Sequence, residues 1–484
     1  MRRRAKGFAR CDLLCLNLPY EIPYKLKHFS RPSRSPCVTR GGTIYIPYYL
    51  ALAVAFAKRE GYRALLIDAV ANDMSFMEVM EHVKSLNPRV IVVDTSTPSI
   101  HNDVIMAEAL QEACPKSSVV LVGRHVTYDA ENTLKACDSV KIVARGYFYK
   151  QVLDLLEGKS LGRIRGISYR DGDKIKHKPD APLPKGEFPF VSEVYKNQLD
   201  LRKYFYASCR YPYLMLNFAL GCPFNCAFCC EYSRTSYNPR PIDNMIEELK
   251  YIKKELPFVK EILFDDPTFV VDEDLICELC DEMIKKGLNV TWSCATRANI
   301  SYDTLKIMKE AGFRLAHIGI ESLNQEALNK INKGMRVEQE VEYLERCEKL
   351  GVLNHACFIV GLPSDNPKTI EATIEYAKRL PAIDTIQVFP AIPTPGLPFY
   401  EWCKENGYLL TEDYSQWLKP DGSYNVVVSY PWLSREEIEF WIKEFYRRFY
   451  FRAKMIMYKI KQSVTSYEEM KRNWMMFKNG IGKI

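Results

Sequence analysis

Short apolar runs alternate with helix-like stretches in two separate parts of this chain, and this alternation restricts the fold more than any other feature. In the first part the strand candidates lie at 13–18, 64–68, 90–94, 119–123 and 140–144, with helical patterns at 47–60, 76–86 and 103–112. Strands that alternate with helices at this spacing form a parallel sheet with helices on both faces. We therefore expect an α/β, doubly wound (Rossmann-like) domain over residues 1–165.

The second series begins near residue 210. Its strand candidates lie at 214–220, 261–264, 290–292, 315–320, 357–360 and 385–389. Helical stretches separate them, which gives six strand–helix units against the eight of a complete barrel. We expect a partial (β/α)6 TIM barrel over residues 206–400.

The segments between and after these series have patterns of their own. Residues 166–205 are polar and proline-rich, and Asp171-Gly172-Asp173 predicts a hairpin turn, so we expect a linker with a small hairpin. Residues 401–484 are expected to be helical, with a capping box at Ser434–Glu437 opening a long helix that is amphipathic, aromatic and basic to Ile456. Such a helix either packs over the barrel or meets anionic lipid at a membrane surface.

Composition limits the partners. The net charge of +7 is spread over 484 residues without a polybasic run, so nucleic acid is not an expected partner. No window supplies the roughly 18 apolar residues of a membrane span, and the N-terminal stretch lacks the features of a signal peptide. We expect a cytoplasmic protein, in which 16 cysteines indicate buried thiols and a metal site rather than a disulfide framework.

Three of the cysteines form a compact motif. Cys222, Cys226 and Cys229 are spaced CxxxCxxC directly after the first strand of the second series, where a barrel has its active face. Three thiolates leave one iron of a [4Fe-4S] cluster without a protein ligand, so that iron is open to a substrate. The alternative is a zinc site, but zinc sites usually pair two CxxC or CxxH halves and no second half appears within reach of this motif. Cys230 is adjacent to Cys229 and is not expected to reach the same cluster.

At these cysteines the chain resembles the radical S-adenosylmethionine (SAM) superfamily. The resemblance implies that the open iron binds SAM and that one electron cleaves SAM to methionine and a 5′-deoxyadenosyl radical. It also implies that Phe228 lies over the cluster near the adenine, and that an electron donor such as ferredoxin or flavodoxin is a partner.

Further stretches resemble the SAM-contacting strand ends of that superfamily. They are Phe264–Phe269, Thr296-Arg297, Gly319–Ser322 and Gly361-Leu362-Pro363, and they imply SAM contacts by Asp266, Arg297, Glu321, Ser322 and Gly361. Arg297 suits the SAM carboxylate, and Glu321 suits its ribose hydroxyls or amino group; the alternative is a structural ion pair. The family continues Gly-Leu-Pro with Gly-Glu-Thr where this chain has Ser364-Asp365-Asn366, which leaves the role of this loop open.

The first domain resembles the cobalamin-binding domain that precedes the barrel in one large radical SAM group. The resemblance rests on strand-end loops and implies cobalamin contacts by Thr95, Ser96, Gly123 and Gly146. The chain has no DxHxxG motif, so no histidine ligand to cobalt is expected. The alternative is a domain that keeps the sheet and has lost the cofactor.

Within this group the chain is similar to hopanoid-associated proteins, through stretches such as Thr291–Cys294 and Lys333–Val337. Related enzymes form cyclopentane rings in tetraether lipids, so the resemblance implies hydrogen abstraction and carbon–carbon bond formation on an isoprenoid membrane lipid. Cobalamin-dependent methylation of an unactivated carbon is the alternative, and a non-catalytic iron-sulfur or cobalamin carrier is a third. Hydrogen abstraction needs no acid or base, so no catalytic side chain is named.

Overall fold

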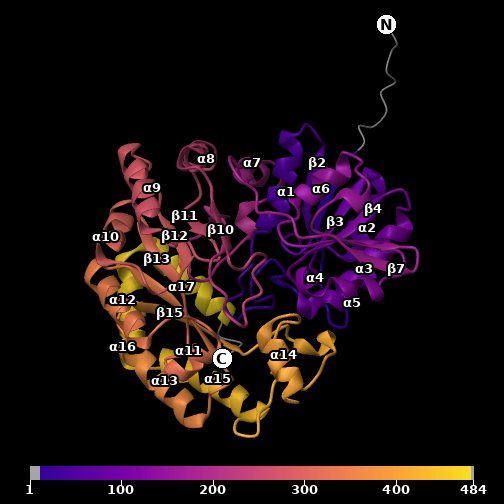
Figure 1. The fold of residues 1–484 in the computed structure, drawn as a ribbon. Helices are drawn as coiled ribbons and strands as arrows, with labels where there is room; N and C mark the ends of the chain where they lie inside the picture. Colours follow the sequence, from indigo (N-terminus) through magenta and orange to yellow (C-terminus); the bar gives the residue numbers. More distant parts are fainter. Residues whose placement is uncertain (1–10, 481–484) are drawn as a thin grey trace. The chain divides into compact units, whose positions relative to one another are not determined.

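The computed structural model describes residues 11–480 and divides the chain into two compact units (Figure 1). The first unit contains the described residues up to Pro36, Pro47–Pro182 and Phe188–Asp200. The second contains Cys37–Ile46, Leu183–Glu187 and the described residues from Leu201 onward. The domain boundaries at residues 165, 205 and 400 stay predictions.

The first unit is built on a seven-stranded sheet in the order β2-β1-β3-β4-β5-β6-β7. The strands are β1 (Leu13–Asn17), β2 (Ala64–Asp68), β3 (Val90–Thr95), β4 (Ser118–Gly123), β5 (Ile142–Ala144), β6 (Ile167–Asp171) and β7 (Lys174–His177). The helices are α1 (Tyr48–Arg59), α2 (Phe76–Leu86), α3 (Ile100–Ala113), α4 (Arg124–Tyr128), α5 (Ala130–Lys135), α6 (Tyr149–Leu156) and α7 (Val191–Gln198), with 3₁₀ turns at Thr97–Ser99 and Leu161–Arg163.

This arrangement confirms the predicted doubly wound fold. Strands β1 to β5 are parallel, and every residue of β1 and β3 is buried, as expected for parallel strands covered on both faces. The hairpin predicted at Asp171-Gly172-Asp173 forms between β6 and β7 and extends the same sheet, because β6 pairs with β5 in antiparallel fashion. The order of β2, β1 and β3 places the first strand between the second and third, so the winding direction reverses between β1 and β3.

The second unit contains six parallel strands in the order β8-β11-β12-β13-β14-β15, which confirms the partial barrel. They are β8 (Tyr213–Leu216), β11 (Glu261–Phe264), β12 (Trp292–Thr296), β13 (Phe313–Glu321), β14 (Leu353–Val360) and β15 (Ile383–Pro390), and a separate antiparallel pair is formed by β9 (Ala219–Cys222) and β10 (Ser236–Pro239). The helices are α8 (Ile242–Glu255), α9 (Glu273–Lys285), α10 (Tyr302–Glu310), α11 (Gln325–Lys330), α12 (Val337–Leu350), α13 (Pro367–Arg379) and α14 (Pro398–Glu405), with 3₁₀ turns at Leu201–Lys203 and Tyr414–Trp417. Figure 1 shows α9, α10, α12 and α13 outside these strands.

The strand predicted at 214–220 is two strands in the structure, which corrects the sequence analysis. The barrel strand β8 ends at Leu216, and β9 starts at Ala219 and pairs with β10 instead of the barrel. The break is stabilised by Asp266, whose carboxylate accepts the backbone N–H groups of Phe218 (3.0 Å) and Ala219 (2.5 Å). Apolar periodicity does not reveal this side-chain contact, so the run of apolar residues looked continuous.

The long helix predicted from Ser434 is also interrupted. It consists of α15 (Arg435–Tyr450) and α16 (Ala453–Thr465), and a further helix, α17 (Tyr467–Gly480), follows. The predicted capping box is present, with Ser434 Oγ accepting from the Glu437 N–H at 3.2 Å. Most apolar side chains of α15 are buried, so this helix packs on its own unit, although Phe440 is 53% exposed. Contact of this region with a membrane surface stays a prediction.

Two tyrosines of α15 contact the edge strand β15. The hydroxyl oxygen of Tyr446 accepts the Val388 N–H at 2.8 Å, and that of Tyr450 accepts the Ile386 N–H at 2.9 Å. An edge strand otherwise presents unpaired N–H groups that can pair with another chain. The two tyrosine hydroxyls therefore give hydrogen-bond partners to N–H groups on the edge that a six-stranded barrel leaves open.

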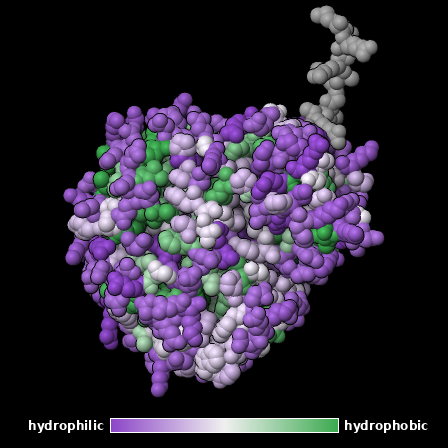
Figure 2. All heavy atoms as spheres, in the orientation of Figure 1, coloured by the Kyte–Doolittle hydropathy of each residue, from purple (hydrophilic) through white to green (hydrophobic). Residues whose placement is uncertain are grey.

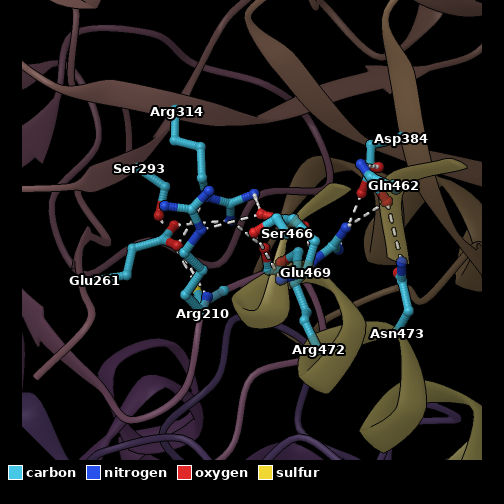
Figure 3. A network of polar contacts seen from close by, with 12 residues as sticks. Arg210, Glu261, Ser293, Arg314, Asp384, Gln462, Ser466, Glu469, Arg472 and Asn473 are labelled. Carbon is cyan, nitrogen blue, oxygen red and sulfur yellow. Dashed lines mark hydrogen bonds and ion pairs between the residues drawn. The ribbon is translucent and has the colours of Figure 1, made fainter. Parts of the chain in front are cut away.

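A buried network of charged side chains joins the starts of the barrel strands to α17 (Figure 3). Glu261 at the start of β11 accepts two bonds from Arg314 of β13, at 2.8 and 2.9 Å. Glu469 of α17 contacts Arg314 at 3.5 Å and Arg472 at 2.8 Å. Arg472 lies 2.9 Å from Asp384 at the start of β15. The barrel is thus closed at its amino-terminal end by ion pairs from α17.

Asp384 is the most strongly perturbed carboxyl of this network. Burial alone would raise its pKa, but Arg472 and Lys459 hold the pKa well below its usual range. The unfolded chain has a pKa of about 3.9 at an aspartate. The network therefore stabilises the fold above about pH 4 and loses this contribution as the pH falls below that value.

On the face of the chain in Figure 2, hydrophilic side chains predominate and hydrophobic ones lie between them, as on most protein surfaces. No helix among residues 11–480 is long and apolar enough to cross a membrane. The large exposed apolar side chains are concentrated on α16 and α17, and include Met457, Ile460, Val464, Trp474 and Phe477.

The network predicts a large cost for removing Arg472. Arg472→Met leaves the buried carboxylates of Asp384 and Glu469 without their shared partner, so we expect a loss of about 3–5 kcal/mol in the free energy of unfolding. Arg447 is the matched control because its side chain is 63% exposed and its guanidinium pairs with Glu444 of the same helix. Arg447→Met should cost less than about 1 kcal/mol in the same urea titration followed by tryptophan fluorescence. Equal losses in the two variants would contradict this account of the network.

Candidate active site

The three predicted cluster cysteines lie in one loop at the carboxyl edge of the barrel. Cys222 is the last residue of β9, and both Cys222 and Cys226 are 8% exposed. Cys229 is half-buried, and its N–H donates to the Cys226 carbonyl at 3.2 Å, so the loop turns tightly between them. The three thiols are not in disulfides.

The loop is fixed at several points along its length. The Ala227 N–H donates to the Ile331 carbonyl at 2.8 Å, and the Ala227 carbonyl accepts from Phe399 at the start of α14. Asn332 Nδ2 donates to the Asn225 carbonyl at 3.0 Å. Backbone contacts of this kind hold the cysteines in place before any cofactor binds.

Arg297 brings positive charge to this loop. It follows β12, is 5% exposed, and lies with Nη1 at 3.8 Å from Cys226 Sγ and its guanidinium over the Phe224 ring at 4.0 Å. Its Nη2 donates to the Lys333 carbonyl. Burial raises the pKa of the Cys222 and Cys229 thiols, so a cation beside the loop favours the thiolate form that a metal requires.

The buried atoms around Arg297 leave hydrogen-bonding capacity for a ligand. Arg297 Nε and the neighbouring Thr296 Oγ1 are buried and have no hydrogen-bond partner among the described residues. An unused buried donor on a guanidinium fits a ligand carboxylate. This arrangement suits the SAM carboxylate that the sequence assigned to Arg297.

Glu321 lies at the carboxyl end of β13 in a strained conformation. Its φ is 65°, in the left-handed region that side chains other than glycine rarely adopt, and the pairing of β13 with β14 shifts register there. Its carboxylate accepts from Lys333 Nζ at 2.8 Å. Such strain is found most often at functional sites, where the surroundings hold it.

Lys333 and Glu340 are site residues that the sequence analysis did not assign. Burial alone would lower the pKa of Lys333, but the Glu321 carboxylate raises it. Glu340 of α12 is fully buried, its pKa is raised well above the usual range by burial, and its two carboxyl oxygens have no hydrogen-bond partner in the described part of the chain. A lysine in a polar turn before Gly334 and a glutamate within a charged helix have no spacing that shows that their side chains are buried.

The side chain of Asp266 is fully buried, whereas a residue that contacts a ligand is commonly open to the site. Its carboxylate accepts the N–H groups that end β8 and begin β9, and so orients the strand that carries Cys222. These bonds support a positioning role for Asp266, whereas its contact with SAM stays a prediction.

Gly361 follows β14 with a φ of 96°, where a residue with a side chain would be strained. The N–H groups of Gly361 and Leu362 both donate to Asp365 at 2.9 Å. Asp365 thus keeps a carboxylate in the loop whose sequence departs from the family pattern, and burial raises its pKa to about 7. Ser322 is 2% exposed, and its hydroxyl accepts the Asn324 N–H at 3.1 Å. Phe228 is half-buried in the cysteine loop.

The predicted cluster and SAM residues therefore meet at one edge of the barrel. Cys222 to Cys229, Asp266, Arg297, Glu321 and Gly361 all follow or end strands on the side where barrels carry their active sites. In the described part of the chain, no three His, Cys, Asp or Glu side chains are close enough to hold a single metal ion. Each cysteine of a four-iron cluster binds a different iron, so the three sulfurs need not converge on one point. The donors present fit a cluster with SAM beside it.

In the first unit, Thr95 ends β3, Ser96 follows it, and Gly123 and Gly146 lie at or after the ends of β4 and β5. The four residues are at the carboxyl edge of the sheet, and Thr95 and Ser96 are at the reversal between β1 and β3 where open α/β sheets bind ligands. Thr95 Oγ1 donates to the Val122 carbonyl at 2.6 Å, and Ser96 Oγ contacts Ser99 Oγ at 2.7 Å. A Cβ on Gly123 would lie 2.2 Å from the Thr95 carbonyl oxygen, so glycine is needed for the close approach of two loops.

The hydroxyls of Thr95 and Ser96 already have hydrogen-bond partners. The four residues therefore fit a nucleotide-like tail through their small side chains and backbone groups. His125 is buried, its ring contacts Thr97 Oγ1 at 3.2 Å, and burial lowers the pKa of the imidazole to about 3. These contacts give His125 a structural role in the loop after β4.

The cysteine loop generates a prediction with an internal control. Replacing Cys222, Cys226 or Cys229 with alanine should abolish the cluster, because each removes the ligand of one iron. Cys230→Ala should keep it. Iron and sulfide analysis after anaerobic reconstitution, with the visible spectrum, measures the outcome. Retention of about four irons per chain in a Cys226→Ala variant would contradict the assignment.

Arg297 generates a second prediction. Arg297→Met should retain the cluster but weaken SAM binding by about tenfold to a hundredfold, since a charge-assisted hydrogen bond contributes about 1.5–3 kcal/mol. Arg336 is exposed at the start of α12 and serves as control, so Arg336→Met should change the affinity by less than about twofold. Equilibrium binding of SAM to cluster-loaded protein gives both values. A normal affinity in Arg297→Met would remove Arg297 from the site.

Comparison with known proteins agrees with this geometry. Residues 216–377 match the family model described as the Radical SAM superfamily. An uncharacterised methyltransferase of Pyrococcus horikoshii is 28% identical over 435 residues, which cover 88% of this chain and 92% of that protein.

Two further relatives have more specific names. The anaerobic magnesium-protoporphyrin IX monomethyl ester cyclase of Rubrivivax gelatinosus is 28% identical over 345 residues, covering 69% of this chain and 62% of that protein. The hopanoid C-3 methylase of Methylococcus capsulatus is 26% identical over 218 residues, covering 44% and 40%. The predicted likeness to hopanoid-associated proteins is thus confirmed.

Among solved structures, the radical SAM methyltransferase TsrM of Kitasatospora setae, determined with cobalamin and a [4Fe-4S] cluster bound, has a TM-score of 0.64 at 13% identity and covers 89% of this chain and 84% of its own. This likeness supports the fold over both units. The predicted resemblance is confirmed: residues 216–377 match the radical SAM superfamily, and the fold over both units is similar to that of a radical SAM methyltransferase with cobalamin bound.

Proposed function

We propose that this radical SAM enzyme is a cobalamin-dependent methyltransferase that methylates an unactivated carbon of an apolar molecule. The observation that carries the proposal is that the likeness to the uncharacterised methyltransferase of Pyrococcus horikoshii extends over 88% of the chain, and so beyond the radical SAM domain. The methylases of hopanoids and the TsrM fold support the same reaction.

We assign residues of this chain to each of the three cofactors. Cys222, Cys226 and Cys229 hold the [4Fe-4S] cluster, with Phe228, Arg297, Glu321, Ser322 and Gly361 around SAM and Asp266 behind the loop. Cobalamin lies at the carboxyl edge of the first sheet, near Thr95, Ser96, Gly123 and Gly146. When bound, cobalamin supplies a transferable methyl group, while the cluster and SAM supply the radical that activates the carbon.

This chain's own residues bind and orient. Arg297 offers a buried donor to the SAM carboxylate, and the pair of Glu321 and Lys333 presents fixed polar groups to the rest of SAM. Reduction of the cluster requires a one-electron donor, for which we propose a ferredoxin or flavodoxin.

Ring formation on a membrane lipid, the first interpretation of the sequence, is the second candidate. The cyclase name of the Rubrivivax relative favours a ring-forming oxidation in this group, but that name concerns a porphyrin. Methylation is supported by the names of more of the relatives, and these include the relative whose match covers 88% of this chain.

The products of SAM distinguish these reactions. Reconstituted protein is incubated with SAM, cobalamin, a reductant and a lipid extract, and the small molecules and lipids are analysed by mass spectrometry. Methylation predicts S-adenosylhomocysteine together with 5′-deoxyadenosine and a lipid heavier by one methylene.

Ring formation predicts 5′-deoxyadenosine without S-adenosylhomocysteine and a lipid that has lost two hydrogens for each ring. The Cys226→Ala variant is the control that should form neither nucleoside. An intact protein that leaves SAM uncleaved would favour the carrier and contradict the proposal.

A further inference from the structure

We infer that a cavity in the second unit binds the apolar chain of a lipid-like alcohol; that this alcohol is the substrate rests on the proposed function. The cavity has a volume of about 690 Å³ and lies among the 39–45 segment, strands β14 and β15, and helices α15, α16 and α17. Ligand pockets for small molecules typically measure about 300–1,000 Å³. The cavity is large enough for a long chain.

The lining is apolar where α16 and α17 contribute to it. The side chains include Met455, Ile456, Ile460, Met470, Trp474 and Phe477. Ile460, Trp474 and Phe477 are 56%, 63% and 56% exposed, so the apolar lining continues to the surface of the two helices. Exposed apolar side chains that adjoin an apolar cavity mark the entrance for an apolar ligand rather than ordinary surface.

One side chain in the cavity has an unused acceptor. Asn473 is 9% exposed, and its Nδ2 donates to Gln462 Oε1 at 3.2 Å (Figure 3) and to Ser463 Oγ at 3.1 Å. Its Oδ1 is buried and has no partner among the described residues. A buried acceptor of this kind is costly unless a donor meets it. A ligand hydroxyl supplies that donor, whereas a carboxylate does not.

The charged and titratable groups that line the cavity have contacts of their own. Lys459 Nζ lies 2.7 Å from Asp384, and Arg40 stacks over the Tyr446 ring at 4.6 Å. His355 contacts Thr385 Oγ1 at 2.7 Å, and burial lowers the pKa of its imidazole to about 4, so the ring is neutral at pH 7. These contacts favour a neutral polar end on the ligand.

The position of the cavity requires a long ligand. It contacts β14 at His355 and β15 at Thr385–Gln387, whereas the SAM residues follow the ends of the strands. At about 3.3 Å per residue, the distance along β14 from His355 to Val360 is about 16 Å. A substrate that occupies the cavity and reacts at the cluster edge must therefore be an extended chain, as lipid alcohols are.

The test measures uptake of radiolabelled hexadecanol by the full chain with its cluster reconstituted, without SAM, cobalamin or reductant. Ile460→Trp places a large ring in the entrance and should weaken uptake by about tenfold or more. Met457 lies on the same helix, is 69% exposed and does not line the cavity, so Met457→Trp is the matched control and should change uptake by less than about twofold. Thermal unfolding midpoints confirm that both variants fold.

A second variant tests whether Asn473 binds the hydroxyl end of the alcohol. Asn473→Leu should weaken hexadecanol uptake by about tenfold while leaving uptake of hexadecane unchanged, because only the alcohol uses the acceptor. Equal uptake by the Ile460→Trp and Met457→Trp variants would overturn the inference. So would palmitate binding as tightly as hexadecanol, or light scattering that shows the exposed helices buried in a dimer that excludes the ligand.

The two experiments test methyl transfer and binding of the alcohol separately, so one can fail without the other. Uptake that follows these expectations in a protein without methyltransferase activity would retain the cavity assignment and reject the proposed reaction. Methylation of another apolar molecule, with no hexadecanol uptake, would retain the proposed reaction and reject the cavity assignment.

Discussion

The rest of the candidate active site depends on the hydrogen bonds that the carboxylate of Asp266 accepts from the backbone. It holds the two backbone N–H groups that stop the first barrel strand and start the strand leading to Cys222. Without that break, the chain would continue along the barrel and carry the first cysteine to a different place. Three sulfurs can bind one cluster only when the loop between them is fixed, and the bonds from Ala227 and Asn225 to the segment after α11 complete the fixation.

Much of the fold could be predicted from the sequence because buried parallel strands are nearly continuous apolar runs. Val90–Asp94 and Ala64–Asp68 are examples in which the predicted and observed strands agree within a residue. The predictions were wrong where a side chain far along the chain decides the local structure. Asp266 divides the run at 214–220, and the helix from Ser434 breaks at Phe451 and Arg452, which no proline or glycine announces.

The cysteines of the site were accessible to sequence reasoning because their spacing is itself a chemical requirement. Lys333 and Glu340 were not, because their significance lies in burial. Lys333 becomes a site residue only when folding places its ammonium 2.8 Å from Glu321, and Glu340 only when its carboxyl is removed from water. The cavity beside β15 was equally hidden, since its lining comes from segments separated by more than 300 residues in the chain.

The tyrosines that cover the edge of β15 have a consequence for how this enzyme can change. A barrel with six strands has an open side, and a further strand beside β15 would cover that edge permanently with backbone bonds. Here phenol hydroxyls from a helix satisfy the edge, so the boundary of the open side is made of side chains. Side chains can be exchanged one at a time without altering the sheet. The lateral opening can therefore be widened, narrowed or made more polar during evolution while the strands that carry the SAM residues stay in place.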